Sequence, residues 1–524
     1  MRRLLFSFLL LSILSISFNV RGQVKSGQNP IIWADVPDPS MVRVGGTYYM
    51  SSTTMHFNPG VPIMKSKDLI NWQIISYAYQ TLGKSDALTL TNGKNAYGKG
   101  SWASCIRYHN GTFYVSTFSS TTNKTYIFYT KDIEKDPWKE ISFSPSFHDN
   151  TLIFDNDGRV YLITGNKKLT LVELKPDLTG VKEGGINQVI IENSSLPSGN
   201  DSGLGEGSQL FMANGKYYLF NITWPKGGMR TVVVHRADKL TGPWEGRVAF
   251  QDKGVAQGGM VDSPDGKWFA YLFRDFGSVG RIPYIVPMKW EDGWPVIGVD
   301  GKAPDNLDLP ASKGLIPGII ANDEFNRKKG EPDLPLVWQW NHNPDNKLWS
   351  VTQRKGFLRL TTGRIDTIFT TARNTLTQRT FGPECSGSAI IDVTNMKEGD
   401  FAGLSLLQRK YGLVGVKFEN GKKYIVMVNA QTNKPVEADR IPLTQKNAYL
   451  KAECDYNDKK DISYFYYSLD GKTWKPIGTS LKMEYSMPHF VGYRFGLFNY
   501  STKTPGGFVD FDWFHISDQI TKKN

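Results

Sequence analysis

The first three hundred residues repeat a short pattern of apolar and polar positions. In each copy an apolar β-type run ends at a polar turn with a glycine, and an aromatic β run follows one or two residues later. A strand, a turn of the Asn-Gly or Asp-Gly kind and a second strand together form the strongest short-range hairpin signal. The turn glycines are Gly46, Gly111, Gly158, Gly215 and Gly266. The pattern therefore predicts five hairpins in five related units.

The spacing of these glycines indicates the architecture. Successive copies lie 65, 47, 57 and 51 residues apart. This period is typical of four-stranded propeller blades with loops of variable length. Residues 23–310 are therefore expected to form a five-bladed β-propeller.

A second unit follows a connector rich in Gly, Pro and Asp over residues 301–335. Beyond it come many short runs of alternating apolar and polar residues, separated by turns such as Asn420-Gly421 and Asp470-Gly471. This is the pattern of an antiparallel sandwich. Residues 311–520 are expected to form a β-sandwich accessory domain, so the fold class is all-β.

The N-terminus has the proportions of an export signal. Arg2 and Arg3 precede an apolar or hydroxylic run from Leu4 to Phe18 that is short for a membrane span. We expect residues 1–22 to be a signal peptide and the protein to be secreted or periplasmic. An uncleaved anchor is the alternative. No later stretch is apolar enough to span a bilayer, so no membrane span is expected after cleavage.

Composition narrows the function classes. The 29 Phe, 24 Tyr, 14 Trp and 51 Gly favour strands and tight turns. The formal charge is +12, and three of those charges, on Arg2, Arg3 and Arg21, lie in the expected signal peptide. The remaining lysines are dispersed, which indicates a solvated surface, and nucleic acid is not an expected partner. The three cysteines form no disulfide framework and no zinc motif. A Cys385–Cys454 bridge and free buried thiols both remain open.

Candidate chemistry appears when equivalent positions of the five units are compared. Nine residues before four of the turn glycines, and eight before Gly46, the chain carries a set of mostly polar residues. In chain order they are Asp38, Trp102, Asp149, Glu206 and Gln257. The first strand of each blade lines the channel of a propeller. These five side chains are therefore expected to face one another around the channel.

Three carboxylates in one pocket point to acid–base chemistry. Burial and like charges push their pKa values apart. Glycoside hydrolysis uses such a split, because one carboxylic acid protonates the leaving oxygen while a carboxylate activates water or attacks carbon. Taken singly, Asp38 before Pro39 could be a turn former, Asp149 a cap, and Glu206 part of a surface loop. These three alternatives do not explain why the three acids stand at equivalent positions of the repeat.

The chain resembles glycoside hydrolase family 43, the β-xylosidase and α-L-arabinofuranosidase family. The motifs are Val36-Pro-Asp-Pro-Ser40, Asn58-Pro-Gly-Val-Pro62, Phe154-Asp-Asn-Asp-Gly158 and Gly205-Glu-Gly207. The resemblance implies an exo-acting, inverting hydrolase that releases xylose or L-arabinofuranose from a plant polysaccharide or oligosaccharide. It implies that Asp38 is the general base, Glu206 the general acid and Asp149 the residue that orients the acid and tunes its pKa.

The same resemblance extends to four further residues. Val279-Gly-Arg281 looks like a substrate-contacting Gly-Arg, so Arg281 is expected to bind sugar hydroxyls, with a structural surface arginine as the alternative. Trp102 resembles an aromatic that stacks on the sugar. Gln257 stands where some relatives place a histidine near an ion, so no cofactor is expected to be required for the chemistry. His148 stands where several relatives carry an aromatic residue, which implies a differently shaped pocket.

The second unit also carries a resemblance. Asp323-Glu-Phe325 and Trp338-Gln-Trp340 are similar to the concanavalin-like sandwich that follows the propeller in a branch of this family. Such a domain can bind glycan, close one side of the active site or stabilise the propeller. Glu324 and Asp512 are candidate ligands of a structural calcium ion, since Ca²⁺ prefers hard oxygen ligands. Solvated surface acids are the alternative.

Two other functions compete. A retaining, fructosidase-like hydrolase would carry an Asn-Asp-Pro-Asn start, which this sequence lacks, and Arg274-Asp275-Phe276 resembles its Arg-Asp-Pro only superficially and in the wrong blade. A non-catalytic propeller that only binds glycan would not need two acids and a modulator.

Overall fold

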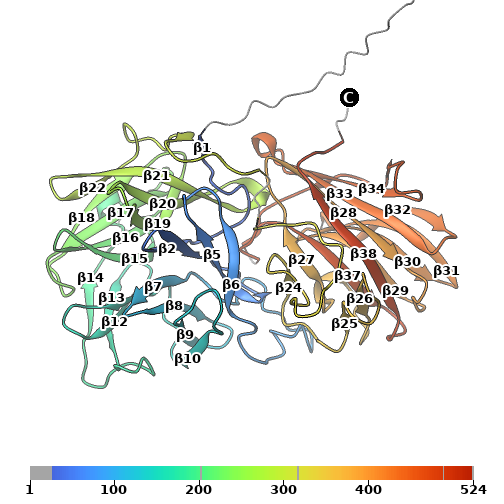
Figure 1. Ribbon diagram of the computed structural model, residues 1–524, viewed down its shortest axis with the longest axis horizontal. Coiled ribbons are helices and arrows are strands. Elements are labelled where there is room, and N and C mark those ends of the chain that lie inside the picture. The colour runs from blue at the N-terminus through green and yellow to red at the C-terminus, as the bar shows by residue number, and fades with distance from the viewer. Residues whose placement is uncertain (1–25, 201–202, 315–317, 433, 488, 522–524) are drawn as a thin grey trace, which may run out of the picture.

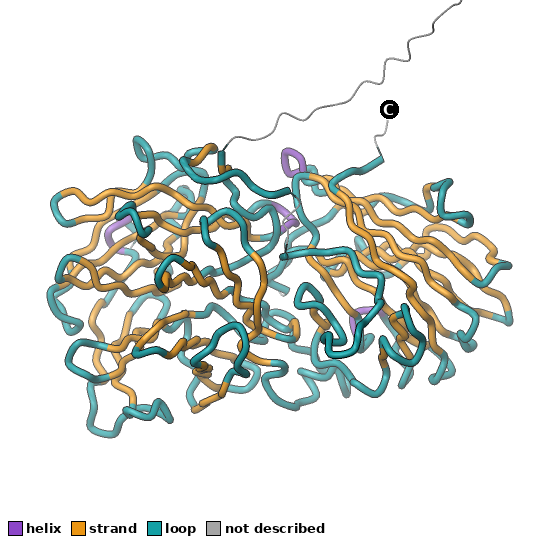
Figure 2. Tube along the Cα trace, in the orientation of Figure 1, coloured by secondary structure: helices purple, strands orange, loops and turns teal. Residues whose placement is uncertain are grey.

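The computed structural model describes residues 26–521 apart from 201–202, 315–317, 433 and 488 (Figure 1). The expected signal peptide, residues 1–22, lies outside the described residues. Almost all regular structure is strand (Figure 2). The helical segments among the described residues are four single 3₁₀ turns: η1 (Leu196–Ser198), η2 (Gly277–Val279), η3 (Phe369–Thr371) and η4 (Asn457–Lys459). None of them approaches the length or hydropathy of a membrane span.

The N-terminal unit consists of five four-stranded antiparallel sheets, which confirms the predicted propeller. The first blade contains β2 (Ser40–Val44), β3 (Thr47–Ser51), β5 (Gly60–Ser66) and β6 (Gln73–Tyr79). The second contains β7 (Cys105–His109), β8 (Thr112–Ser119), β9 (Lys124–Thr130) and β10 (Lys139–Phe143). The third contains β11 (Thr151–Phe154), β12 (Val160–Thr164), β13 (Leu169–Leu174) and β14 (Asn187–Ile191). The fourth contains β15 (Gly205–Ala213), β16 (Lys216–Thr223), β17 (Thr231–Ala237) and β18 (Glu245–Phe250). The fifth contains β19 (Val255–Asp262), β20 (Trp268–Asp275), β21 (Arg281–Glu291) and β22 (Trp294–Ile297).

The turn glycines lie where the repeat predicted them, between the first and second strands of each blade. Gly111, Gly158, Gly215 and Gly266 have φ between 73° and 83°. Backbones in this left-handed region strongly favour glycine, which explains the recurrence. The ends of the propeller are joined by β1 (Gly27–Gln28), which pairs with β23 (Asn306–Leu307) after the last blade.

The C-terminal unit is a β-sandwich (Figure 1, right). One sheet has the order β32 (Val436–Leu443), β31 (Lys422–Asn429), β30 (Gly412–Glu419), β29 (Asp400–Leu407), β37 (Arg494–Ser501), β27 (Leu376–Arg379), β24 (Gln339–Asn341) and β4 (Phe57–Asn58). The other has the order β25 (Trp349–Ser350), β26 (Leu358–Thr361), β38 (Phe508–Ser517), β28 (Glu384–Asp392), β33 (Asn447–Asp455), β34 (Ile462–Ser468) and β35 (Lys475–Pro476), with β36 (Leu481–Lys482) also paired to β34. Buried apolar side chains such as Leu404, Leu450 and Phe495 fill the space between them.

The two units share a sheet. Strand β4 belongs to the connection between β3 and β5 of the first blade, yet it pairs with β24 at the edge of the sandwich, with Asn58 opposite Trp340. Burying an otherwise open sheet edge stabilises both partners. The sandwich is therefore built partly from the propeller.

The three cysteines are free thiols in the structure. Cys385 and Cys454 lie directly opposite each other in β28 and β33, both buried and both free. Cys105 is also a free buried thiol. Of the two readings of the sequence, the free thiols are the one that the structure has.

Candidate active site

Asp38, Asp149 and Glu206 lie at equivalent ends of the first strands of three blades. Asp38 and Asp149 each precede a first strand by two residues, and Glu206 is the second residue of β15. Asp38 and Asp149 have φ of 50° and 44°. Positive φ is uncommon for a residue with a side chain and clusters at functional sites. The backbone thus turns both carboxyl groups away from the regular strand direction.

The fourth and fifth blades use bulges for the same purpose. The register shifts after Glu206 in β15 and after Ala256 in β19, where Gln257 has φ 54°. A β-bulge re-aims the side chain beside it. A Cβ on Gly207 would lie 2.7 Å from the Gln257 side chain, so a glycine is required next to Glu206. Gln257, Asp38 and Asp149 line a small cavity at the base of the site.

His148 contacts two of the three acids. Its Nε2 lies 2.9 Å from Oε2 of Glu206 and 3.6 Å from Oδ2 of Asp149. The backbone N–H of Gly207 donates to the same Asp149 oxygen at 2.9 Å. One ligating atom from each of His148, Asp149 and Glu206 lies within 4.8 Å of the other two. Among the described residues this is the one group of three such side chains that is compact enough to hold a metal ion.

Asp38 is paired differently. Arg281 Nη1 donates to its Oδ1 at 2.7 Å, and Arg281 Nε lies 3.6 Å from Oδ1 of Asp275. Asp275 also forms an ion pair with Arg230. Alternating charges therefore run from Arg230 through Asp275 and Arg281 to Asp38. Arg281 is 8% exposed, so the surface-arginine reading is wrong.

Burial and neighbouring charges shift the pKa values of the ionisable groups at the site. Burial raises the pKa of Asp38, although Arg281 and Arg230 oppose that rise. Burial, with help from Glu206 and Asp38, raises the pKa of Asp149 to about 7. Burial alone would lower the pKa of His148, but the charges of Asp149 and Glu206 outweigh it and raise that pKa to about 9. The site therefore holds groups whose protonation states are strongly interdependent.

The sandwich contributes one wall of the site. The Phe490 ring lies 5.0 Å from that of Trp102, and the guanidinium of Arg281 lies 5.4 Å from Phe490 on one side and 5.2 Å from Phe273 on the other. Tyr485, from the same segment between β36 and β37, is near enough for its pKa to be affected by Arg281 and Asp38 after the larger effect of burial.

Several polar atoms around this wall have no hydrogen-bond partner among the described residues. They are Trp102 Nε1 and Tyr485 Oη, together with Asp275 Oδ1 and Arg281 Nε, which face each other as an ion pair at 3.6 Å. Buried polar groups normally find a partner in the protein or in a bound molecule. Sugar hydroxyls both donate and accept, so they can pair with an indole N–H such as that of Trp102 and with a phenol such as that of Tyr485.

Four of the residues at the site were missed by the sequence analysis: Arg230, Asp275, Tyr485 and Phe490. Arg230 lies between β16 and β17, outside the repeated phase, and the other three have no counterpart in the repeat. Asp275 was noticed only within Arg274-Asp275-Phe276. The segment 484–493 is far from the propeller in sequence, and nothing in its local pattern predicts a role at the channel.

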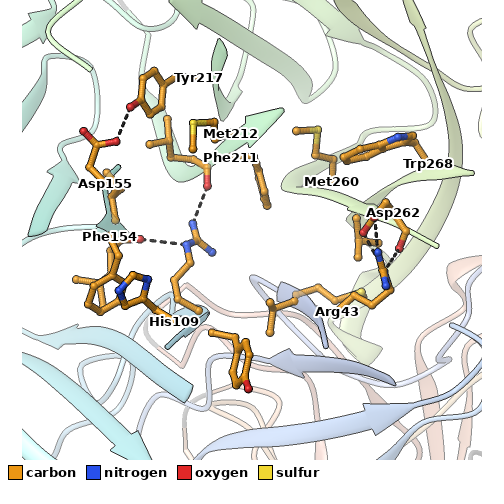
Figure 3. Close-up of a pocket in the computed structure, with 18 residues that line it drawn as sticks. Arg43, His109, Phe154, Asp155, Phe211, Met212, Tyr217, Met260, Asp262 and Trp268 are labelled. Carbon is orange, nitrogen blue, oxygen red and sulfur yellow. Dashed lines mark hydrogen bonds and ion pairs between the residues drawn. The ribbon is translucent and has the colours of Figure 1, made fainter. Parts of the chain in front are cut away.

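A larger pocket lies at the opposite ends of the first strands (Figure 3). Its acidic lining residues are already engaged, since Arg43 Nε donates to Asp262 at 2.9 Å and Tyr217 donates to Asp155. The guanidinium of Arg107 donates hydrogen bonds to Leu152 O, Leu210 O and Thr151 Oγ1. The two acidic residues that line this pocket, Asp155 and Asp262, are therefore both paired.

The proposed calcium ligands lie on the sandwich. Glu324 is hydrogen-bonded to His515, and its charge adds to burial in raising the pKa of Asp512. Among the described residues, neither acid belongs to a group of three ligating side chains. A calcium site there stays a prediction.

Comparisons with known proteins cover both units of the chain. Residues 27–295 match the model of glycosyl hydrolases family 43, and residues 322–517 match that of the β-xylosidase C-terminal concanavalin A-like domain. A bifunctional GH43-CE protein of Bacteroides eggerthii is 65% identical, with a TM-score of 0.94 over 95% of this chain. The alignment covers 64% of that protein, so this chain spans less than two thirds of its length.

The names of the curated relatives include both β-xylosidases and arabinofuranosidases. A β-xylosidase of Formosa agariphila is 28% identical over 93% of this chain and 89% of its own. A non-reducing end α-L-arabinofuranosidase of Bacteroides ovatus is 26% identical over 74% of each chain.

Proposed function

The chain belongs to glycoside hydrolase family 43, and on that premise we propose that it is an exo-acting, inverting hydrolase of plant cell-wall polysaccharide or oligosaccharide. The released sugar would be a terminal xylose or L-arabinofuranose. The observation that carries this proposal is the meeting of Asp38, Asp149 and Glu206, from three blades, at one mouth of the channel.

The roles follow from the surroundings of each carboxyl group. The hydrogen bond from Arg281 to Asp38 favours the ionised form, as a general base requires. Glu206, which lies with Asp149 in the acidic cluster, takes the role of general acid, the group that protonates the leaving oxygen. Asp149 is held by the N–H of Gly207 and acts on Glu206 through its charge and position.

The aromatic wall supports exo action on a small sugar. Trp102 and Phe490 come from different domains and approach within 5.0 Å, which narrows the site on one side. Aromatic faces and buried polar atoms suit a pentose with several hydroxyl groups. The names of the relatives cover both xylose and arabinofuranose, so both sugars belong to the proposal.

Release assays on p-nitrophenyl β-xyloside and p-nitrophenyl α-arabinofuranoside, together with arabinoxylan, test this function. We expect one of the two aryl glycosides to be cleaved with clearly higher kcat/KM and single sugars to be the products from polymer. A protein that binds arabinoxylan and releases no sugar would be a glycan-binding propeller instead.

We further propose that the protein is exported. The support is Arg2, Arg3 and the apolar run Leu4–Phe18. N-terminal sequencing of the mature protein, expressed in a bacterial host, should find a new terminus near Gln23. A mature chain that still begins at Met1 would contradict cleavage.

A further inference from the structure

We propose that the acid end of the catalytic pocket is also a binding site for a divalent transition-metal ion of the zinc type. The ligands would be His148, Asp149 and Glu206, and the bound ion would block the acid. Binding stands on the geometry of these three residues. The block of hydrolysis rests on the proposed function of Glu206.

The distances between ligand atoms suit a zinc ion. His148 Nε2 is 2.9 Å from Glu206 Oε2 and 3.6 Å from Asp149 Oδ2, and all three atoms lie within 4.8 Å of one another. Zinc bonds of about 2.0–2.2 Å in a tetrahedral site place neighbouring ligand atoms about 3.3 Å apart. Small side-chain movements are therefore enough to bring all three atoms into contact with one ion.

The ligands are held by outer contacts. Gly207 N–H donates to Asp149, and the carbonyl of His148 accepts from Thr164 Oγ1 at 2.6 Å and from Gly165 N–H at 3.2 Å. The His148 ring packs edge-on against Phe118 at 5.2 Å. Outer contacts of this kind orient the ligands of metal sites and contribute to their affinity.

The site is reachable from solvent. The side chains of His148 and Glu206 are 37% and 21% exposed, while that of Asp149 is 7% exposed. An ion held by these three ligands keeps a fourth position for water, as in zinc sites with three protein ligands. Asp38 is not a member of this compact group, and its Oδ1 accepts a hydrogen bond from Arg281.

The donor set selects the class of ion. An imidazole nitrogen suits zinc, copper and nickel, whereas calcium and magnesium prefer oxygen ligands. Two carboxylates balance the charge of a divalent ion. His148 supplies the one imidazole nitrogen of the group, so the selection of the ion depends on this residue.

Bound metal would stop proton transfer for a structural reason. The Glu206 oxygen that contacts His148 would be coordinated to the ion, and a coordinated carboxylate holds no proton for the leaving oxygen. The ion would also occupy space beside the sugar.

Isothermal titration of the full chain with ZnCl₂ tests the binding. We expect one site in the wild-type protein, and an affinity lowered by more than about tenfold in His148→Phe and in His148→Gln. The glutamine variant keeps a polar group if the phenylalanine variant folds poorly. His515→Gln is the matched control, because His515 pairs with Glu324 on the sandwich, and it should bind zinc like the wild type. CaCl₂ and MgCl₂ should not compete.

Wild-type affinity in both His148 variants, or loss of the site in His515→Gln, would overturn the proposal. An assay of glycoside hydrolysis is the second test. Zinc should inhibit the wild-type protein reversibly, and activity should recover when EDTA is added. Zinc binding at His148 with unchanged hydrolysis would refute the block alone. If the chain cleaved no glycoside at all, the proposed function would fail, and the titration would still decide the metal site.

Discussion

The buried carboxylate of Asp35 links the two domains by accepting a hydrogen bond from the backbone N–H of Gly492 at 2.9 Å. Its other oxygen accepts from the backbone N–H of Arg281 at 2.8 Å. Arg281 holds Asp38, and Gly492 follows the segment that carries Phe490. One carboxylate therefore positions both the partner of the expected base and the aromatic wall.

Asp35→Asn should destabilise the protein and reduce activity together. The amide that replaces one oxygen cannot accept from the N–H it faces, and a buried unsatisfied group costs about 1–3 kcal/mol. Thermal unfolding should show a lower Tm, and kcat/KM should fall. Asp265→Asn, in an exposed turn, is the control. Unchanged stability and kinetics in Asp35→Asn would show that the domains do not depend on this contact.

Glu206→Ala should cut hydrolysis of polysaccharide by orders of magnitude. An aryl glycoside with a good leaving group needs little protonation, so its cleavage should suffer less. Measuring kcat/KM for both substrates with both proteins gives the comparison. An equal loss on the two substrates would remove Glu206 from the role of acid.

Asp149→Asn should move the alkaline limb of the pH–rate profile downward. Burial raises the pKa of Asp149 to about 7, so its carboxylate is charged above that pH. A negative charge beside a carboxylic acid opposes the loss of its proton, so the variant should lose activity at a lower pH than the wild type. The profile of kcat/KM against pH reports the shift. An alkaline limb at its wild-type position would mean that Asp149 does not tune the acid.

A chain that ends at Gly318 should be unstable or impaired. Removing the sandwich exposes β4, deletes Phe490 and leaves Asp35 without Gly492. Phe490→Ala in the full chain separates the effects, because it removes the wall and keeps the domain. Solubility, Tm and kcat/KM of the two proteins should rank truncation as the more damaging change. A stable and fully active truncated chain would make the sandwich an independent module.

The repeat in the sequence was sufficient to predict the propeller. Gly158 and Gly215 mark turns that need a left-handed backbone, and the residues nine positions before them, Asp149 and Glu206, meet in one group. These are local signals, since a turn or a strand is specified by neighbouring residues.

The contacts between the domains could not be predicted in this way. Phe490 lies more than 380 residues from Trp102 in the chain, and β4 pairs with a strand that begins at Gln339. No periodicity relates such distant segments, and β4 has only two residues. The contact of His148 with Glu206 was also missed, because blade counting places a side chain on a strand and does not give its direction.

The stereochemistry of hydrolysis tests the central account most directly. Asp38 and Glu206 come from the first and fourth blades. An inverting pair leaves room for a water, with carboxyl groups about 6.5–9.5 Å apart, whereas a retaining pair is about 5–5.5 Å apart. Proton NMR of the first-formed sugar, recorded before mutarotation, distinguishes them. The account predicts a product with the anomeric configuration opposite to that of the substrate. A product that keeps the substrate's configuration would contradict it and favour a covalent, fructosidase-like mechanism.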